Sequence, residues 1–110
     1  MIYYLDSSVI LRVLLGQPGA LAEWPSIEHG VASGLVEVEC FRVLDRLHLA
    51  HEAGDEDLAT RREALYRILD SVTLIDPNRA ILRRAAQPMP TTLGSLDAVH
   101  LATALLWREV

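Results

Sequence analysis

Hydrophobic positions in the first 16 residues change from an unbroken run to a helical spacing. The run Ile2 to Leu5 is apolar throughout, which is typical of a strand covered on both faces of a sheet. Residues 6–8 are all good helix N-cap types, and apolar residues then recur at helical spacing up to Gly16, a common C-cap. The chain therefore opens with a strand, an acid and a helix.

A longer helix is predicted between residue 34 and about residue 52. Its buried stripe is made by apolar residues at steps of four, three and four positions, namely Val36, Cys40, Val43 and Leu47. Residues 16–30 are rich in Gly and Pro and predict a loop with one short helix near 20–24. Val31 and Ala32, just before the long helix, are predicted to form a short second strand.

The second half of the chain repeats the alternation of helices and strands. A helix with three acids in its first turn is predicted over 55–69, and the β-branched run 72–75 predicts a third strand. Asn78 is predicted to cap a helix over 79–86, and Ser95 to cap a last helix that runs to the chain end. Strands alternating with helices predict an α/β fold with a parallel sheet.

Length and composition limit the kinds of protein that fit. A chain of 110 residues has room for one core, so residues 1–110 are predicted to form a single domain. No apolar run approaches a membrane span, and the N-terminus lacks the features of a signal peptide. Cys40 is the only cysteine, so no internal disulfide can form. We therefore expect a cytoplasmic protein that does not bind a membrane.

The charge of the chain excludes some chemistries. A net charge of −5 argues mildly against nucleic acid as a partner, although arginine can fork onto phosphate oxygens and a local arginine-rich surface could hold a backbone. All basic residues are Arg, and the chain contains no Lys. Response-regulator receivers and haloacid-dehalogenase-type phosphatases both need a lysine near the reacting aspartate, so neither class fits.

Two carboxylates occupy positions that suggest chemistry. Asp6 stands at the carboxyl end of the first predicted strand, which is the edge where ligands bind in open parallel sheets; helix capping is its alternative role. Asp97 lies in the first turn of the last helix, in line with an apolar stripe, and stabilising the helix dipole is its alternative role. Its carboxylate is therefore predicted to be desolvated or to meet a partner, unless the end of the helix protrudes. The stripe consists of Leu101, Ala104 and Leu105.

The long helix carries two further acids, Glu37 and Glu39, on opposite flanks of its buried stripe. Helical periodicity does not choose between them. For Glu39 the alternative is an exposed ion pair with Arg42, three residues further on.

The histidines and tryptophans are interpreted structurally. His48 and His51 have the spacing of a metal-binding pair, but no second pair supports them, so a solvated face is favoured. His100 is interpreted as a packing residue, and Trp24 and Trp107 as core or interface residues.

Three segments resemble PIN-domain ribonuclease toxins of the VapC type in their order and spacing: YYLDSSVILRVL, VASGLVEVECFRVLDRL and TTLGSLDAVHLATAL. On this resemblance, the places of three metal-binding acids are taken by Asp6, Glu39 and Asp97. Glu39 is assigned by its Glu-x-x-Arg context with Arg42. Small-hydroxyl positions beside the first acid, which hold a metal ligand or water in place, are taken by Ser7 and Ser8.

The resemblance implies a fold and a function. The fold is a PIN-like three-layer sandwich with a parallel central sheet and helices on both faces. Carboxylates about 5 Å apart repel by about 3 kcal/mol per pair, which a cation among them offsets, and hard oxygen ligands suit Mg²⁺ or Mn²⁺. The implied reaction is metal-dependent hydrolysis of RNA phosphodiester bonds. The implied partners are RNA, a cognate antitoxin protein and a second copy of the chain in a homodimer.

The sequence departs from the family pattern at its C-terminus. Relatives continue into a further strand, a fourth acid and a closing helix, whereas this sequence stops at Val110, so these elements are expected to be missing. Glu109 cannot replace the fourth acid, because it lies about 18 Å along the same helix from Asp97 at about 1.5 Å per residue. The alternative function is therefore a catalytically impaired PIN-like module that binds an antitoxin or dimerises without cleaving RNA.

Overall fold

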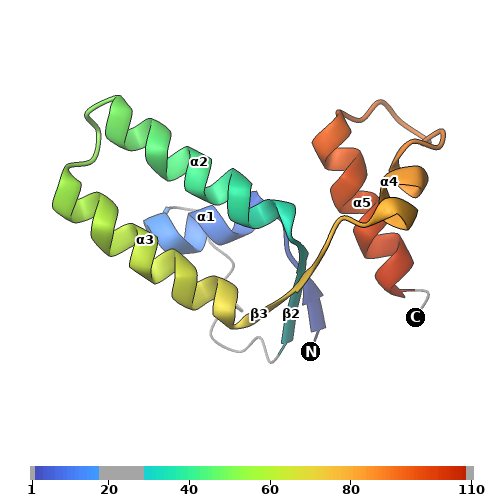
Figure 1. Ribbon diagram of the computed structural model, residues 1–110, viewed down its shortest axis with the longest axis horizontal. Coiled ribbons are helices and arrows are strands. Elements are labelled where there is room, and N and C mark those ends of the chain that lie inside the picture. The colour runs from blue at the N-terminus through green and yellow to red at the C-terminus, as the bar shows by residue number, and fades with distance from the viewer. Residues whose placement is uncertain (1, 18–28, 109–110) are drawn as a thin grey trace.

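The computed structural model describes residues 2–17 and 29–108, which form an α/β arrangement around one parallel sheet (Figure 1). The sheet order is β1-β2-β3. The elements in chain order are β1 (Ile2–Tyr4), α1 (Ser7–Leu15), β2 (His29–Ser33), α2 (Leu35–Leu49), α3 (Asp55–Asp70), β3 (Val72–Ile75), α4 (Arg79–Ala85) and α5 (Ser95–Arg108). The predicted loop helix near 20–24, Trp24 and Glu109 lie outside the described residues.

All three strands run in the same direction, so their carboxyl ends meet at one edge of the sheet. Tyr4 pairs with Val31 in the β1–β2 ladder, and Ser33 pairs with Ile75 in the β2–β3 ladder. Each strand is followed at that edge by the start of a helix or a loop. A ligand bound at this edge would therefore meet residues from several elements.

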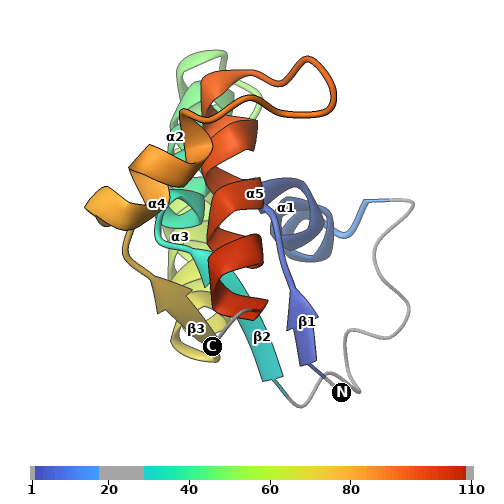
Figure 2. The ribbon, with the colours of Figure 1, turned by 90° about the vertical axis from the view of Figure 1, so that its right-hand side faces the viewer.

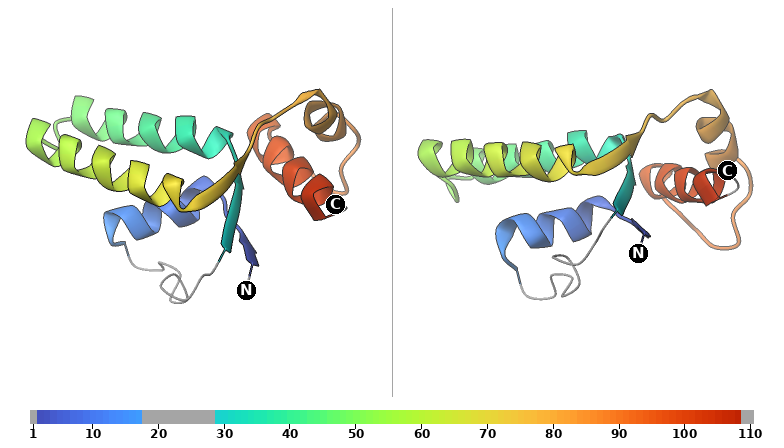
Figure 3. Two further views of the ribbon diagram at one scale, coloured as in Figure 1. Left: turned by 60° about the horizontal axis from the view of Figure 1, so that its bottom comes forward. Right: turned by 90° about the horizontal axis from the view of Figure 1, so that it is seen from below.

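Helices cover the sheet on both faces, which confirms the predicted three-layer sandwich. Helices α1, α2 and α3 lie together on one face, and α4 and α5 lie on the other (Figure 3). Helix α5 packs on the middle strand β2 and runs in the opposite direction to the strands (Figure 2). Its N-terminal end is therefore brought toward the carboxyl edge of the sheet.

The main core lies between the sheet and helices α1 to α3. Its buried members include Leu5, Ile10, Val36, Cys40, Leu44, Leu65 and Leu69. Gly30 on β2 allows Leu5 to pack closely, since a Cβ at Gly30 would lie 2.9 Å from the Leu5 Cδ1 atom. The buried stripe of α2 was predicted one position off: Leu44 is buried, whereas Val43 and Leu47 are only half-buried on its flank.

Local signals set most helix ends. Asp6 and Asn78 cap α1 and α4 through their side chains, and Gly16 ends α1 in the left-handed conformation at φ 62°. All three assignments agree with the prediction. Ser95 is not a cap but the first residue of α5, because the carbonyl of Gly94 accepts from Ala98 N–H. None of the described helices has the length and apolarity needed to cross a membrane.

Candidate functional site

Asp6 lies where β1 passes into α1, and its carboxylate is held by local donors. Oδ1 accepts from the Ser8 hydroxyl at 2.7 Å and from Val9 N–H at 3.1 Å. Burial acts to raise the pKa of Asp6, but these hydrogen bonds and the nearby His100 outweigh it and lower the pKa below its usual value. The side chain remains exposed. Asp6 therefore caps the helix and also presents an ionised carboxylate to solvent.

Glu39, in the second turn of α2, is joined to α5 on the opposite face of the sheet. Its Oε1 atom lies 2.5 Å from His100 Nε2, and only 24% of the Glu39 side chain is exposed. Glu37 is exposed. Of the two acids that periodicity left open, Glu39 is therefore the one that the fold brings into a contact between layers.

The exposed ion pair considered for Glu39 is not formed. Arg42 donates instead to Asp45 at 2.7 Å, on the solvent side of α2. An exposed pair of this kind contributes little to stability. Glu39 is thus left to its contact with α5, and Arg42 lies in the Glu-x-x-Arg pattern without binding Glu39.

The charges of Asp6 and Glu39 both act on the buried thiol of Cys40, which follows Glu39 in α2. Burial raises the pKa of Cys40 to about 12, and the negative charges of Glu39 and Asp6 add to this effect. Its Sγ atom donates to the carbonyl of Ser7 at 3.8 Å, which ties α2 to the start of α1. The two carboxylates therefore lie close enough to act on a common neighbour, while the thiol itself is inert.

Asp97 is exposed, as are the residues before it, so its carboxylate is not desolvated and the alternative of a protruding helix end holds. The reason is the face that α5 turns to the sheet. Small residues, Ala98 and Ala102, are buried there with Thr103, whereas Leu101 is 37% exposed. Asp97 lies in line with Leu101 rather than with these buried residues, and both are exposed. Asp97 still lies one helical turn before His100, a spacing that places Cβ atoms about 5–6 Å apart.

His100 is a residue whose position sequence reasoning misjudged. It is buried as expected, with 8% of its surface exposed, but it contacts Glu39 rather than only packing. Its Nδ1 atom and the hydroxyl of Tyr4 are buried without a hydrogen-bond partner among the described residues. The one available signal was its place three residues after Asp97, on the same side of the helix.

The carboxylate oxygens of Asp6, Glu39 and Asp97 are ligands of the kind that a hydrated divalent cation prefers. No group of three His, Cys, Asp or Glu side chains within 2–17 and 29–108 is arranged as a ready-made metal site. Mg²⁺, however, usually keeps several waters and is bound through one or two carboxylates. Asp6 and Glu39 supply hard oxygens at the same edge of the sheet, and Asp97 lies one turn from the residue that holds Glu39. These three acids are the residues that would hold the ion.

His48 and His51 lie at and just beyond the C-terminal end of α2. His48 Nε2 lies 2.6 Å from Asp55 Oδ1, beside a surface hollow of about 470 Å³ that His51 also lines. The Asp55 side chain is almost fully exposed. His51 is exposed, whereas His48 is half-buried.

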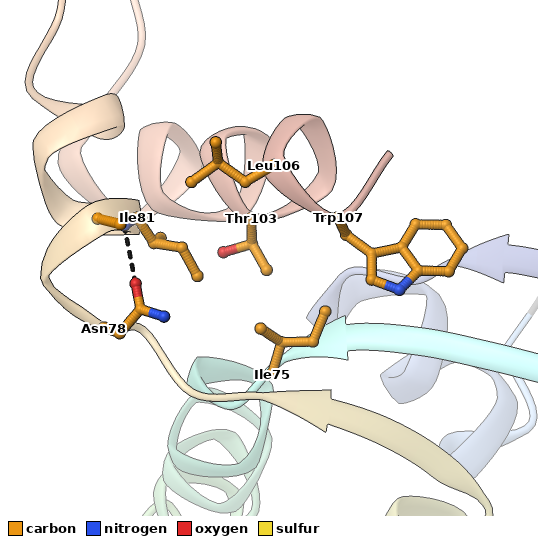
Figure 4. Close-up of a pocket in the computed structure, with 7 residues that line it drawn as sticks. Ile75, Asn78, Ile81, Thr103, Leu106 and Trp107 are labelled. Carbon is orange, nitrogen blue, oxygen red and sulfur yellow. Dashed lines mark hydrogen bonds between the residues drawn. The ribbon is translucent and has the colours of Figure 1, made fainter. Parts of the chain in front are cut away.

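An apolar groove of about 480 Å³ opens between β3, α4 and α5 (Figure 4). Its lining residues are Ile75, Asn78, Ala80, Ile81, Thr103, Leu106 and Trp107. Asn78 is committed to capping α4 through the N–H of Ile81. None of the described residues that line the groove is acidic, and Asp6, Glu39 and His100 are not among them.

Comparisons with known proteins give one consistent result. The family described as PIN domain matches residues 3–107. The chain is 33% identical over 105 residues to "Ribonuclease VapC46" of Mycobacterium tuberculosis, covering 92% of this chain and 72% of that protein. It is 32% identical over 108 residues to "Ribonuclease VapC47" of the same species, covering 92% and 73%. A solved structure, "Toxin-antitoxin complex from Klebsiella pneumoniae", shares the fold with a TM-score of 0.70 at 19% identity, covering 98% of this chain and 81% of that one.

Proposed function

Because this chain belongs to the PIN-domain family, as the resemblance predicted, we propose that it is a metal-dependent endoribonuclease, the toxin of a type II toxin–antitoxin pair. The observation that carries the proposal is the contact of Glu39 with His100 across the sheet, near the carboxyl end of β1, which Asp6 follows. Two relatives with over 30% identity are named ribonucleases. The substrate class is therefore RNA.

The acids would share the work of holding Mg²⁺ or Mn²⁺. Asp6 is fixed by the Ser8 hydroxyl and by a backbone N–H, so its carboxylate is already oriented. Glu39 is fixed by His100, and Asp97 stands exposed on the outer side of α5, where a polyanion would approach. A divalent cation bound there supplies an activated water and neutralises charge on the phosphate. Ser7 and Arg42 flank the two first acids in sequence and are proposed as supporting residues.

The overall reaction is hydrolysis of an RNA phosphodiester. The oxygen of water forms a bond to phosphorus, the bond from phosphorus to the 3′ oxygen breaks, and a proton ends on that 3′ oxygen. The products are a 5′-phosphate and a 3′-hydroxyl. With a net charge of −5, the protein cannot attract RNA by overall charge, so local cations must bring the phosphate to the acids.

The test is cleavage of a defined RNA in Mg²⁺ or Mn²⁺ by the wild type and by Asp6→Asn. Asparagine caps a helix about as well as aspartate, so this variant removes the charge and keeps the fold. We expect a loss of at least about 100-fold in cleavage rate, since the charge stabilisation at stake is several kcal/mol. Glu63→Gln is the control, an exposed acid on α3 that pairs with Arg67, and should cleave normally.

The proposed partners follow from family membership. A cognate antitoxin is expected to bind over the acidic edge, and the chain is proposed to form a homodimer in the cytoplasm. The alternative function is a PIN-like module that binds its antitoxin and cleaves nothing. The absence of a ready-made ligand group among the described acids favours that alternative. Antitoxin binding without cleavage in any metal would establish it.

A further inference from the structure

His100 connects the two helical layers at the acidic edge of the sheet. Its Nε2 atom lies 2.5 Å from Glu39 Oε1, across 61 positions in the sequence. An ionised carboxylate can only accept a hydrogen bond, so against an ionised Glu39 it is Nε2 that donates. A histidine that served packing alone would not need to direct a ring nitrogen at a carboxylate.

The contact is the one that holds Glu39 in the described part of the chain. Arg42, the nearest cation on α2, donates to Asp45 instead. Among residues 2–17 and 29–108, the Glu39 side chain makes its hydrogen bond with His100 and with no other group. The remaining carboxylate oxygen, Oε2, is therefore left without a hydrogen bond from these residues.

The ring of His100 is also anchored in a place where it cannot swing freely. Its side chain is 10% exposed, and Nδ1 is buried with no hydrogen-bond partner among the described residues. It lies near enough to Asp6 to lower the pKa of that carboxyl. The same imidazole therefore contacts Glu39 and also acts on the charge of Asp6, and it belongs to the helix that carries Asp97.

We propose that His100 is a positioning residue that holds the Glu39 carboxylate beside Asp6, so that the two acids bind a divalent cation together. This inference rests on the proposed function and adds a residue to its machinery. The bond from Nε2 fixes one oxygen of Glu39 and leaves the other for the ion. Since His100 and Asp97 share α5, the same bond also sets how far the third acid lies from Glu39.

The experiment is a titration of Mn²⁺ into the metal-free protein, followed by calorimetry, for two amide variants. The amide nitrogen in His100→Gln reaches about as far as Nε2 and can donate to Glu39. The amide in His100→Asn is one methylene shorter and falls short. We expect His100→Asn to bind Mn²⁺ about 10- to 100-fold more weakly, as partners of metal ligands typically do when lost, and His100→Gln to lie close to the wild type.

A double-mutant cycle separates positioning from structure. Glu39→Gln alone should weaken Mn²⁺ binding, and adding His100→Asn should then cause little further loss, since the carboxylate to be positioned is gone. Equal losses in both backgrounds would overturn the proposal, because His100 would then act as a ligand itself or through the fold. Circular dichroism of the metal-free variants checks folding. His100→Phe, which keeps a ring and has no donor, replaces the Asn variant if that one does not fold.

The chain offers a matched control at the other end of α2. His48 makes the same kind of contact with Asp55, at 2.6 Å, away from the acids, so His48→Asn should leave Mn²⁺ affinity unchanged. Normal affinity in His100→Asn together with a loss in Asp6→Asn overturns the role of His100 and leaves the nuclease proposal standing. A wild type that binds no Mn²⁺ overturns both.

Discussion

The two faces of the sheet are built from different materials. The face under α1, α2 and α3 is packed with large aliphatic side chains, among them Ile10, Leu44 and Leu65. The face under α5 is covered by alanines, Thr103 and His100, and the unpartnered hydroxyl of Tyr4 lies there as well. Large apolar groups supply stability through burial, whereas small and polar ones allow close approach and directed contacts. The first face holds the fold together, and the second supplies His100, which contacts Glu39 from across the sheet.

The largest expected effect comes from a substitution that creates a cavity in the aliphatic core. Leu65→Ala removes a fully buried side chain and should lower the free energy of unfolding by about 2–5 kcal/mol in urea titrations. Leu82→Ala, at a leucine that is 49% exposed on α4, is the control and should cost much less. If Leu65→Ala lowered Mn²⁺ affinity of the folded fraction as much as Asp6→Asn, the two faces would not be separable.

Metal should stabilise the folded protein by binding to the acids proposed as its ligands. Mg²⁺ at ten times its dissociation constant would add about 1.4 kcal/mol to the free energy of unfolding. For a chain of this size that is a rise in melting temperature of several degrees, measurable by scanning calorimetry. Asp97→Asn should weaken the response. A melting curve that is the same with and without metal would contradict the proposed site.

Asp6 both caps α1 and is a proposed metal ligand, and two substitutions separate these roles. Asp6→Ala loses the cap of α1 as well as the charge, and should cost about 1 kcal/mol of stability without metal. Asp6→Asn should keep most of that stability. Both variants should lose metal-dependent cleavage alike. Equal stability of the two in urea unfolding would show that the bond to Val9 N–H contributes nothing.

The smallest expected effect is on the stability of the protein at low pH. The pKa of Asp6 is lowered in the folded protein, so its ionised form favours folding. This contribution is fully present above the pKa of the unfolded chain, about 3.9, and is lost as pH falls through the lower folded value. The stability difference between the wild type and Asp6→Asn, measured by urea unfolding, should therefore shrink below about pH 4. A difference that grows on acidification would mean that folding raises the pKa of Asp6 instead of lowering it.

The sequence predicted those features that are decided within a few residues. Asp6 and Asn78 start their helices, and Gly16 ends α1, through hydrogen bonds to groups three or four positions away. The β-branched run Val72–Ile75 is a strand as expected. The parallel order of the elements followed from their alternation. Even the choice of helix faces was nearly right for α2, where one large stripe dominates.

What could not be predicted depends on contacts between distant parts of the chain. His100 looked like a packing residue because its partner lies 61 positions away. Asp97 was placed on the wrong side because hydrophobicity alone favours leucines for burial, while Ala98 and Ala102 make the closer contact with the sheet. Glu39 could be told from Glu37 only by resemblance, since both flank the same stripe. The site residues themselves remain a prediction until metal binding is measured.

The buried thiol of Cys40 has a practical consequence. With a pKa of about 12, Cys40 remains protonated at neutral pH, and its burial keeps alkylating agents and oxidants away. It is also the only cysteine in the chain. Its reaction with iodoacetamide therefore requires the structure around it to open, and the rate of labelling reports how often that happens. Labelling of Cys40 therefore measures local opening next to Glu39, one of the residues proposed to bind the metal.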